Sequence, residues 1–176
     1  MEKPLPSLVG FSEKNHQWFA EGISLAKLAH DFSTPLYVYS KEAICSAYRA
    51  YDAACIRPNG TRRARIHYAM KANSNLAVLD ELKQLGAGFD LVSGGELARA
   101  LQIGADPKSL VFAGVGKSSA EIENALRAGV KCINVESISE LQRVNAIAKT
   151  LGLRAPISLR VNPDVDANTH PYISTG

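Results

Sequence analysis

The chain has 176 residues, of which 46% are hydrophobic and 21% charged. This composition is typical of a globular protein and excludes a disordered chain, which would be poorer in apolar residues. The net charge of +3 is too weak for a protein whose main partner is nucleic acid. No apolar run reaches the ~18 residues of a membrane-spanning helix. Because the N-terminus lacks the basic start and apolar core of a secretory signal, we expect a cytoplasmic protein.

The cysteines give no sign of a disulfide framework or of a zinc site. Cys45, Cys55 and Cys132 form an odd set, and no two of them are arranged as CxxC. Zinc sites and disulfide scaffolds need paired cysteines at short, regular spacings. We therefore expect buried or half-buried thiols in a reducing compartment, and no metal.

The N-terminal part predicts a lead-in segment over residues 1–35. A helix is expected over 24–32, capped by Ser24 and ended by a Thr-Pro pair, because the residue before proline disfavours helix. A short strand is expected over 36–39. Ser40 then caps a second helix.

From residue 66 onward the chain alternates regularly between strand-like and helix-like segments. The expected strands are 66–70, 89–93, 110–113, 132–135 and 157–161, and the expected helices lie near 76–85, 95–103, 119–128 and 138–151. A glycine follows each helix, which is typical of a left-handed cap. The alternation predicts βαβ units and a parallel sheet.

Two architectures fit this alternation, a barrel and a doubly wound open sheet. The strand ends recur at intervals of roughly 22 residues, which both architectures allow. Side chains alternate across a strand, so each predicted strand has an apolar face and a face that turns polar towards its end. An open parallel sheet covered on both sides would be apolar on both faces. The alternation therefore favours a barrel with its polar face inside.

The polar face carries four charged side chains, Lys71, Asp90, Glu136 and Arg160. Buried charges must be paired, so mutual pairing is one interpretation. Active sites of such barrels lie at the carboxyl ends of the strands, which is the other interpretation. Lys71 ends the first of these strands, and partial desolvation there would favour its free amine. A free amine condenses with an aldehyde to form a Schiff base, whereas the alternative is an ordinary paired lysine.

Several longer runs resemble a known family. They are FSTPLYVYS (32–40), YAMKANSN (68–75), GAGFDLVSGGEL (86–97), VFAGVGKS (111–118), INVES (133–137) and RVNPDVDANTHPYISTG (160–176). In this order they resemble the bacterial diaminopimelate decarboxylases, which are pyridoxal-phosphate enzymes with an alanine-racemase-like barrel and a β domain. The resemblance implies an α/β fold with a partial (β/α)8 TIM barrel over 36–176. The lead-in over 1–35 would pack with the β domain.

The resemblance also implies the site and the reaction. Lys71 would hold pyridoxal phosphate covalently and act as the catalytic residue, while meso-diaminopimelate loses CO2 and becomes L-lysine. Asp90 would orient or balance the charge of Lys71, and Arg160 would hold both in place near the cofactor. Weaker candidates are Asn73, Glu136 and His170.

Several alternatives stay open. The pair Gly94-Gly95 follows a strand and opens a helix, where amides can bind phosphate, although a tight turn is the simpler interpretation. The substrate could be another basic amino acid, with decarboxylation or racemisation as the reaction. The chain could also be a non-catalytic half barrel or a plain phosphate-binding βα protein. Because the family continues beyond Gly176, we expect an incomplete portion of a homodimeric enzyme with no nucleic-acid or membrane partner.

Overall fold

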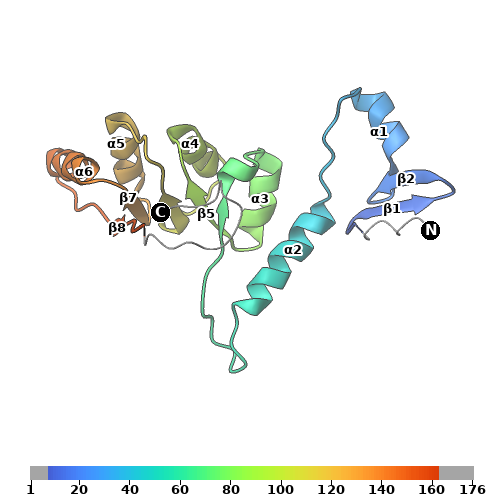
Figure 1. Cartoon of the computed structure of the whole chain (residues 1–176), viewed down its shortest axis with the longest axis horizontal. Coiled ribbons are helices and arrows are strands. Elements are labelled where there is room, and N and C mark those ends of the chain that lie inside the picture. Colours follow the sequence, from blue (N-terminus) through green and yellow to red (C-terminus); the bar gives the residue numbers. More distant parts are fainter. Residues whose placement is uncertain (1–7, 163–176) are drawn as a thin grey trace. The chain divides into compact units, whose positions relative to one another are not determined.

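The computed structural model describes residues 8–162 (Figure 1). They form two compact units. The first unit contains the described residues up to Ile66 together with 75–87, and the second contains 67–74 and the described residues from Gly88 onward. The predicted boundary at residue 35 stays a prediction, because this division follows compactness and does not test it.

The first unit begins with a small antiparallel sheet that the sequence did not predict. Its strands, in the order β1-β2-β3, are β1 (Phe11–Lys14), β2 (Gln17–Ala20) and β3 (Ile23–Ser24). Asn15 and His16 join β1 to β2 with φ of 53° and 61°, the positive values that a tight hairpin turn requires at both central residues. Strands this short show too little alternation to be recognised in a sequence.

Three helices complete the first unit: α1 (Leu25–Phe32), α2 (Lys41–Ala54) and α3 (Leu76–Gln84). Both predicted serine caps are confirmed: the Ser24 hydroxyl accepts from the Lys27 amide and Ser40 from Ala43. The predicted strand over 36–39 is wrong. These described residues join no ladder, because an extended segment becomes a strand only beside a partner strand.

The second unit is a parallel five-stranded sheet with helices along it, which confirms the predicted α/β class. The strands, in the order β4-β5-β6-β7-β8, are β4 (His67–Ala69), β5 (Gly88–Leu91), β6 (Leu110–Phe112), β7 (Cys132–Val135) and β8 (Ile157–Leu159). The helices α4 (Gly94–Gln102), α5 (Ser119–Ala128) and α6 (Ile138–Leu151) lie along one face (Figure 1). Two short 3-10 turns are η1 (Met70–Ala72) and η2 (Pro107–Ser109).

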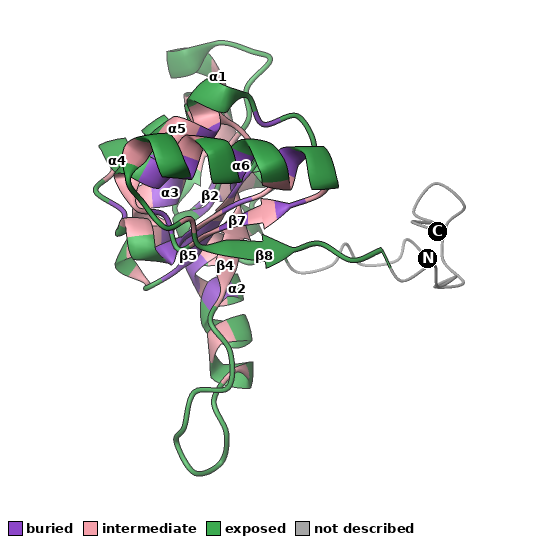
Figure 2. Ribbon diagram, turned by 90° about the vertical axis from the view of Figure 1, so that its left-hand side faces the viewer, coloured by how far each residue is buried: buried purple, intermediate pink, exposed green. Residues whose placement is uncertain are grey.

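The core of the second unit is the sheet face that the alternation predicted to be apolar. Phe89, Leu91 and Ile133 are fully buried, and the buried residues gather on the strands and the inner sides of the helices (Figure 2). The exception is β8, which is exposed along its length in Figure 2 and where Leu159 keeps 65% of its surface accessible. The helices end as predicted, and Gly129 and Gly152 take the left-handed conformation with φ of 76° and 64°.

Candidate active site

Lys71 lies at the carboxyl end of β4, in the turn η1. Its neighbour Met70 is fully buried and anchors the turn, whereas Lys71 is exposed. The register of the parallel pair β4–β5 sets Ala69 beside Asp90, two residues before the lysine. Within residues 8–162 Lys71 forms no ion pair, although its charge acts on Asp90. The amine is therefore accessible at the end of the sheet where a barrel would bind its ligand.

Asp90 is half-buried in β5 and lies in a field of several charges. Burial raises the pKa of the Asp90 carboxyl, and the positive charges of Lys71, His67 and Arg160 oppose that rise, in this order of strength. The negative charge of Glu136 adds to the rise. The structure therefore brings Lys71, Asp90, Arg160 and Glu136 into one electrostatic group, as the strand alternation predicted, and adds His67, which the sequence analysis did not single out.

Glu136 connects the ends of three strands. One carboxylate oxygen, Oε2, accepts a hydrogen bond from Arg160 Nη1 at 2.9 Å, and the other, Oε1, accepts the amide of Gly114 at 2.8 Å. The Glu136 side chain is 8% exposed and that of Arg160 is 62% exposed. The amide of Arg160 also donates to the carbonyl of Val135 at 3.0 Å. Arg160 is thus held at both its backbone and its guanidinium.

The weaker candidates are placed differently. Asn73 ends η1, and its carbonyl oxygen accepts a hydrogen bond from the Tyr68 hydroxyl at 3.3 Å. This contact shapes the turn that carries Lys71. His170 lies outside the described residues.

The glycine amides that could have held a phosphate already have carboxylate partners. The amide of Gly94 donates to Glu121 Oε1 at 2.7 Å, and the amide of Gly114 donates to Glu136. A Cβ added at Gly94 would lie 2.9 Å from Glu121 Cγ. An anion at either amide would have to displace a carboxylate, so the tight-turn interpretation of these glycines is the better one.

Two corners at the carboxyl ends of β5 and β7 share one design that the sequence analysis missed. At the first, Glu96 Oε2 accepts the amide of Val92 at 2.6 Å; at the second, Glu140 Oε2 accepts that of Glu136 at 2.8 Å. In each, the serine between them caps the helix by accepting the amide of the glutamate. The signal in the sequence was the repeated S-x-x-E after a strand, which is the pattern of a capping box.

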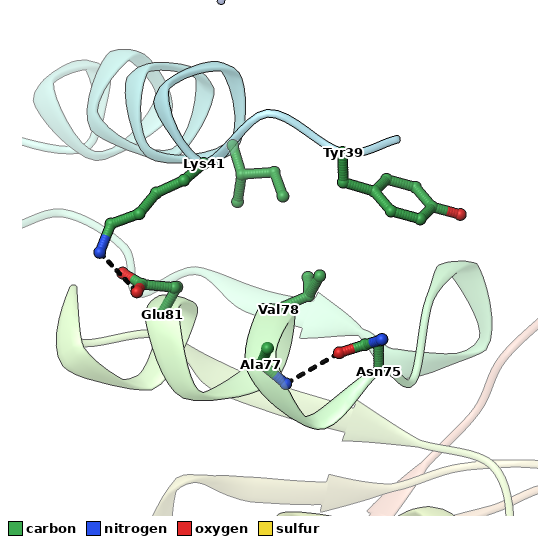
Figure 3. Close-up of a pocket in the computed structure, with 7 residues that line it drawn as sticks. Tyr39, Lys41, Asn75, Ala77, Val78 and Glu81 are labelled. Atoms are coloured by element: carbon green, nitrogen blue, oxygen red, sulfur yellow. Dashed lines mark hydrogen bonds and ion pairs between the residues drawn. The ribbon is translucent and has the colours of Figure 1, made fainter. Parts of the chain in front are cut away.

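The first unit contains a separate hollow of about 320 Å³. It is lined by Tyr39, Lys41, Ile44, Asn75, Ala77, Val78 and Glu81 (Figure 3). Lys41 Nζ pairs with Glu81 Oε1 at 2.5 Å on one side, and Asn75 caps α3 on the other (Figure 3). None of the predicted site residues lines it, so we do not assign the predicted chemistry to this hollow.

Residues 8–162 contain neither a membrane-spanning helix nor a cluster of metal-binding side chains. The described helices are too short or too polar to cross a lipid bilayer. Across the same residues, no three side chains of the metal-binding types come together.

Comparison with known proteins identifies the family. Residues 42–176 match the family described as "Pyridoxal-dependent decarboxylase, pyridoxal binding domain". The chain belongs to this family. The resemblance found in the sequence is thereby confirmed, and so is the expected cofactor, because pyridoxal phosphate is the cofactor of these amino-acid decarboxylases.

Individual relatives of the chain carry a more specific name. It is 54% identical over 167 residues to the diaminopimelate decarboxylase of Pseudomonas aeruginosa, covering 94% of this chain and 39% of the relative. The crystal structure of diaminopimelate decarboxylase from M. jannaschii in complex with L-lysine matches with a TM-score of 0.86 and 42% identity, over 94% of this chain and 39% of that one. The corresponding Helicobacter pylori structure with L-lysine matches with a TM-score of 0.77 and 45% identity, over 84% and 36%. The chain therefore spans about two fifths of the length of these relatives.

The described residues fit one part of a pyridoxal phosphate site. Lys71 is exposed rather than partly desolvated as expected, so the aldehyde can reach its side chain, and its charge acts on the half-buried carboxyl of Asp90. The amides of Gly94 and Gly114 do not suit the phosphate, since glutamates bind both.

Proposed function

We propose that this chain contributes the lysine-bearing part of an enzyme that decarboxylates meso-diaminopimelate to L-lysine and CO2. The observation that carries the proposal is 54% identity along 94% of the chain to a relative named diaminopimelate decarboxylase. The relatives solved with L-lysine support the product. The lysine/ornithine decarboxylase of Vibrio vulnificus is only 26% identical, which favours diaminopimelate over another basic amino acid.

The proposed architecture is a partial TIM barrel. Support comes from five parallel strands in sequential order, helices along one face and charged residues at the carboxyl ends. The homodimer implied by the resemblance is part of the same proposal, and native mass spectrometry of the isolated protein tests it.

The proposed roles follow from the site geometry. The amine of Lys71 binds the cofactor aldehyde, and Asp90 balances the charge of that amine. Glu136 holds the guanidinium of Arg160 at the same end of the sheet. When bound, pyridoxal phosphate supplies an electron-accepting ring that stabilises the carbanion left by the departing CO2.

Covalent attachment at Lys71 is the first test. The protein is incubated with pyridoxal phosphate, reduced with borohydride and digested, and the modified peptide is located by mass spectrometry. We expect the modification on the peptide that contains Lys71, and its loss in Lys71→Ala. The matched control is Lys108→Ala, which changes an exposed lysine in η2, before β6, and should keep the modification. Modification that persists in Lys71→Ala would refute the assignment.

Release of CO2 is the second test, and it separates the substrates. We expect release from meso-diaminopimelate to exceed that from L-ornithine or L-lysine by at least about a hundredfold, because a site built for a second polar group rejects analogues that lack it. Preference for ornithine or lysine would favour the alternative decarboxylase. Attachment at Lys71 without release of CO2 from any of them would favour the non-catalytic half barrel.

A further inference from the structure

A buried ion pair lies beside the predicted site residues and has no role in the function proposed above. The side chains of Lys117 and Glu140 are 1% and 4% exposed, and Lys117 Nζ lies 2.8 Å from Glu140 Oε1. The ammonium also donates to two backbone carbonyls, those of Gly114 and, at 2.9 Å, Asn134. A buried ammonium is costly unless it is fully compensated, and these three contacts compensate it.

The two carboxylate oxygens of Glu140 make different contacts. Oε1 receives the charge of Lys117, and Oε2 accepts the amide of Glu136 at 2.8 Å. Oε1 has no aligned hydrogen bond within the described residues, so the ionic contact with Lys117 fixes its position. The lysine therefore sets the orientation of the carboxylate that holds the backbone of Glu136.

The peptide groups of Gly114 are held from both sides by the same network. Its carbonyl accepts from Lys117 and its amide donates to Glu136. Its φ is 104°, and a Cβ there would lie 3.3 Å from the carbonyl oxygen of Val92, which favours glycine. The Glu136 side chain is thus fixed at its own backbone and at the Gly114 amide, which leaves its second oxygen directed at Arg160.

The corner after β5 shows that helix capping does not require the ion pair. There Glu96 accepts the amide of Val92 as Glu140 accepts that of Glu136. Within the described residues Glu96 forms no ion pair, and α4 begins as regularly as α6. Buried ion pairs are also weak contributors to stability, because desolvation offsets their attraction. Of the two corners, the one that carries Glu136 has a buried lysine beside it. This difference points to a role of the lysine that is connected with Glu136.

We propose that Lys117 and Glu140 are positioning residues that hold the Glu136 carboxylate in the orientation in which it binds Arg160. The pair acts on the backbone of Glu136 and on the Gly114 peptide, and through them on the guanidinium beside Asp90. The consequence for the cofactor rests on the proposed function, whereas the positioning of Glu136 does not.

Amide hydrogen exchange tests the positioning without any cofactor. The double variant Lys117→Met/Glu140→Met replaces the pair with apolar side chains of similar length, a change that buried pairs often tolerate. We expect a melting temperature near that of the unchanged protein, with the amides of Glu136 and Gly114 exchanging about tenfold faster or more. The amide of Val92 should keep its rate. The matched variant Glu96→Met removes the acceptor of the Val92 amide and should show the opposite pattern.

Unchanged exchange at Glu136 and Gly114 in a folded double variant would overturn the proposal. Should the double variant fail to fold, Glu140→Gln replaces it. The neutral amide keeps the shape of the side chain but loses the charge that attracts the ammonium of Lys117. We expect faster exchange at the same two amides by at least about threefold. Wild-type rates there would also overturn the proposal.

A second readout connects the pair to the cofactor. The double variant and Glu136→Gln should weaken attachment of pyridoxal phosphate at Lys71 by similar factors. Combining all three changes should weaken it no further, because residues that act through one group are not additive. Full additivity would contradict an action through Glu136. If the unchanged protein does not attach the cofactor at Lys71, the proposed function fails, and the exchange rates still decide the role of the pair.

Discussion

The side chain of Glu121 connects the starts of the helices α4 and α5. Although this side chain is only partly buried, we expect its removal to lower the free energy of unfolding. Its Oε1 accepts the amide of Gly94, where α4 begins, at 2.7 Å. Its Oε2 accepts the amide and the hydroxyl of Ser118, the cap of α5, at 2.9 and 2.8 Å. The change Glu121→Ala removes all three hydrogen bonds at once.

The magnitude follows from these bonds. A net hydrogen bond to a charged group stabilises a fold by about 1.5–3 kcal/mol when buried, and a helix cap contributes about 1 kcal/mol. Because this site is partly open to water, which replaces some of the lost bonds, we expect Glu121→Ala to lower the free energy of unfolding by about 2 kcal/mol. The control is Glu123→Ala on the same helix, which loses an exposed pair with Arg127 and should cost at most about 0.5 kcal/mol.

Urea unfolding followed by circular dichroism measures both values. The pH dependence gives a second check, because the hydrogen bonds from the Ser118 and Gly94 amides lower the pKa of Glu121 below its ordinary 4.5. A carboxylate with a lowered pKa in the folded state stabilises the fold above pH 4.5 and loses that contribution as the pH falls through the folded value. Glu121→Gln should therefore flatten the loss of stability below pH 4.5. Equal destabilisation by Glu121→Ala and Glu123→Ala would refute this account.

Two further changes test other parts of the chain. Glu21→Gln removes the charge of a carboxylate that accepts the hydroxyl of the α2 cap at 2.6 Å and an α2 amide at 2.7 Å. We expect a lower melting temperature by scanning calorimetry, and no decrease would show that the charge of Glu21 does not stabilise the start of α2. Gly88→Ala would place a Cβ 2.6 Å from both the His67 ring and the Ser109 carbonyl, and should cost about 1–3 kcal/mol in urea unfolding. Gly116→Ala, which meets nothing within 4 Å, is its control, and equal losses would exclude crowding as the cause.

Elements with local stop and start signals were predictable from the sequence. The limits of α5 and α6 agree with the structure to the residue, because serines cap their starts and Gly129 and Gly152 end them. The grouping of Lys71, Asp90 and Arg160 also followed from the sequence, since parallel strands bring their carboxyl ends to one edge and side chains alternate. The helix limits depend on capping residues close in sequence, and the grouping depends on the rule that parallel strands end at the same edge of a sheet.

Features that depend on distant partners were not predictable. The segment 36–39 has the composition of a strand, yet strand formation depends on a neighbouring ladder. Lys117 carries no local sign of burial, because the carbonyl of Asn134 and the carboxylate of Glu140 that compensate it come from β7 and α6. The ring of His67 occupies the space that a side chain at Gly88 would fill, and from there its charge acts on Asp90. This contact depends on the pairing of β4 with β5, which the sequence alone does not show.

At the two corners after β5 and β7, the backbone is held by bonds that do not involve the side chain of the residue that is held. In both, a serine and a glutamate fix the backbone of the residue before the serine, which is Val92 in one and Glu136 in the other. These hydrogen bonds are made to the main-chain amides of Val92 and Glu136, so they form with any side chain at these two positions. Such a position can exchange an apolar group for an acid during evolution while the helix behind it starts unchanged, and a designer could introduce new reactive groups at the same two places.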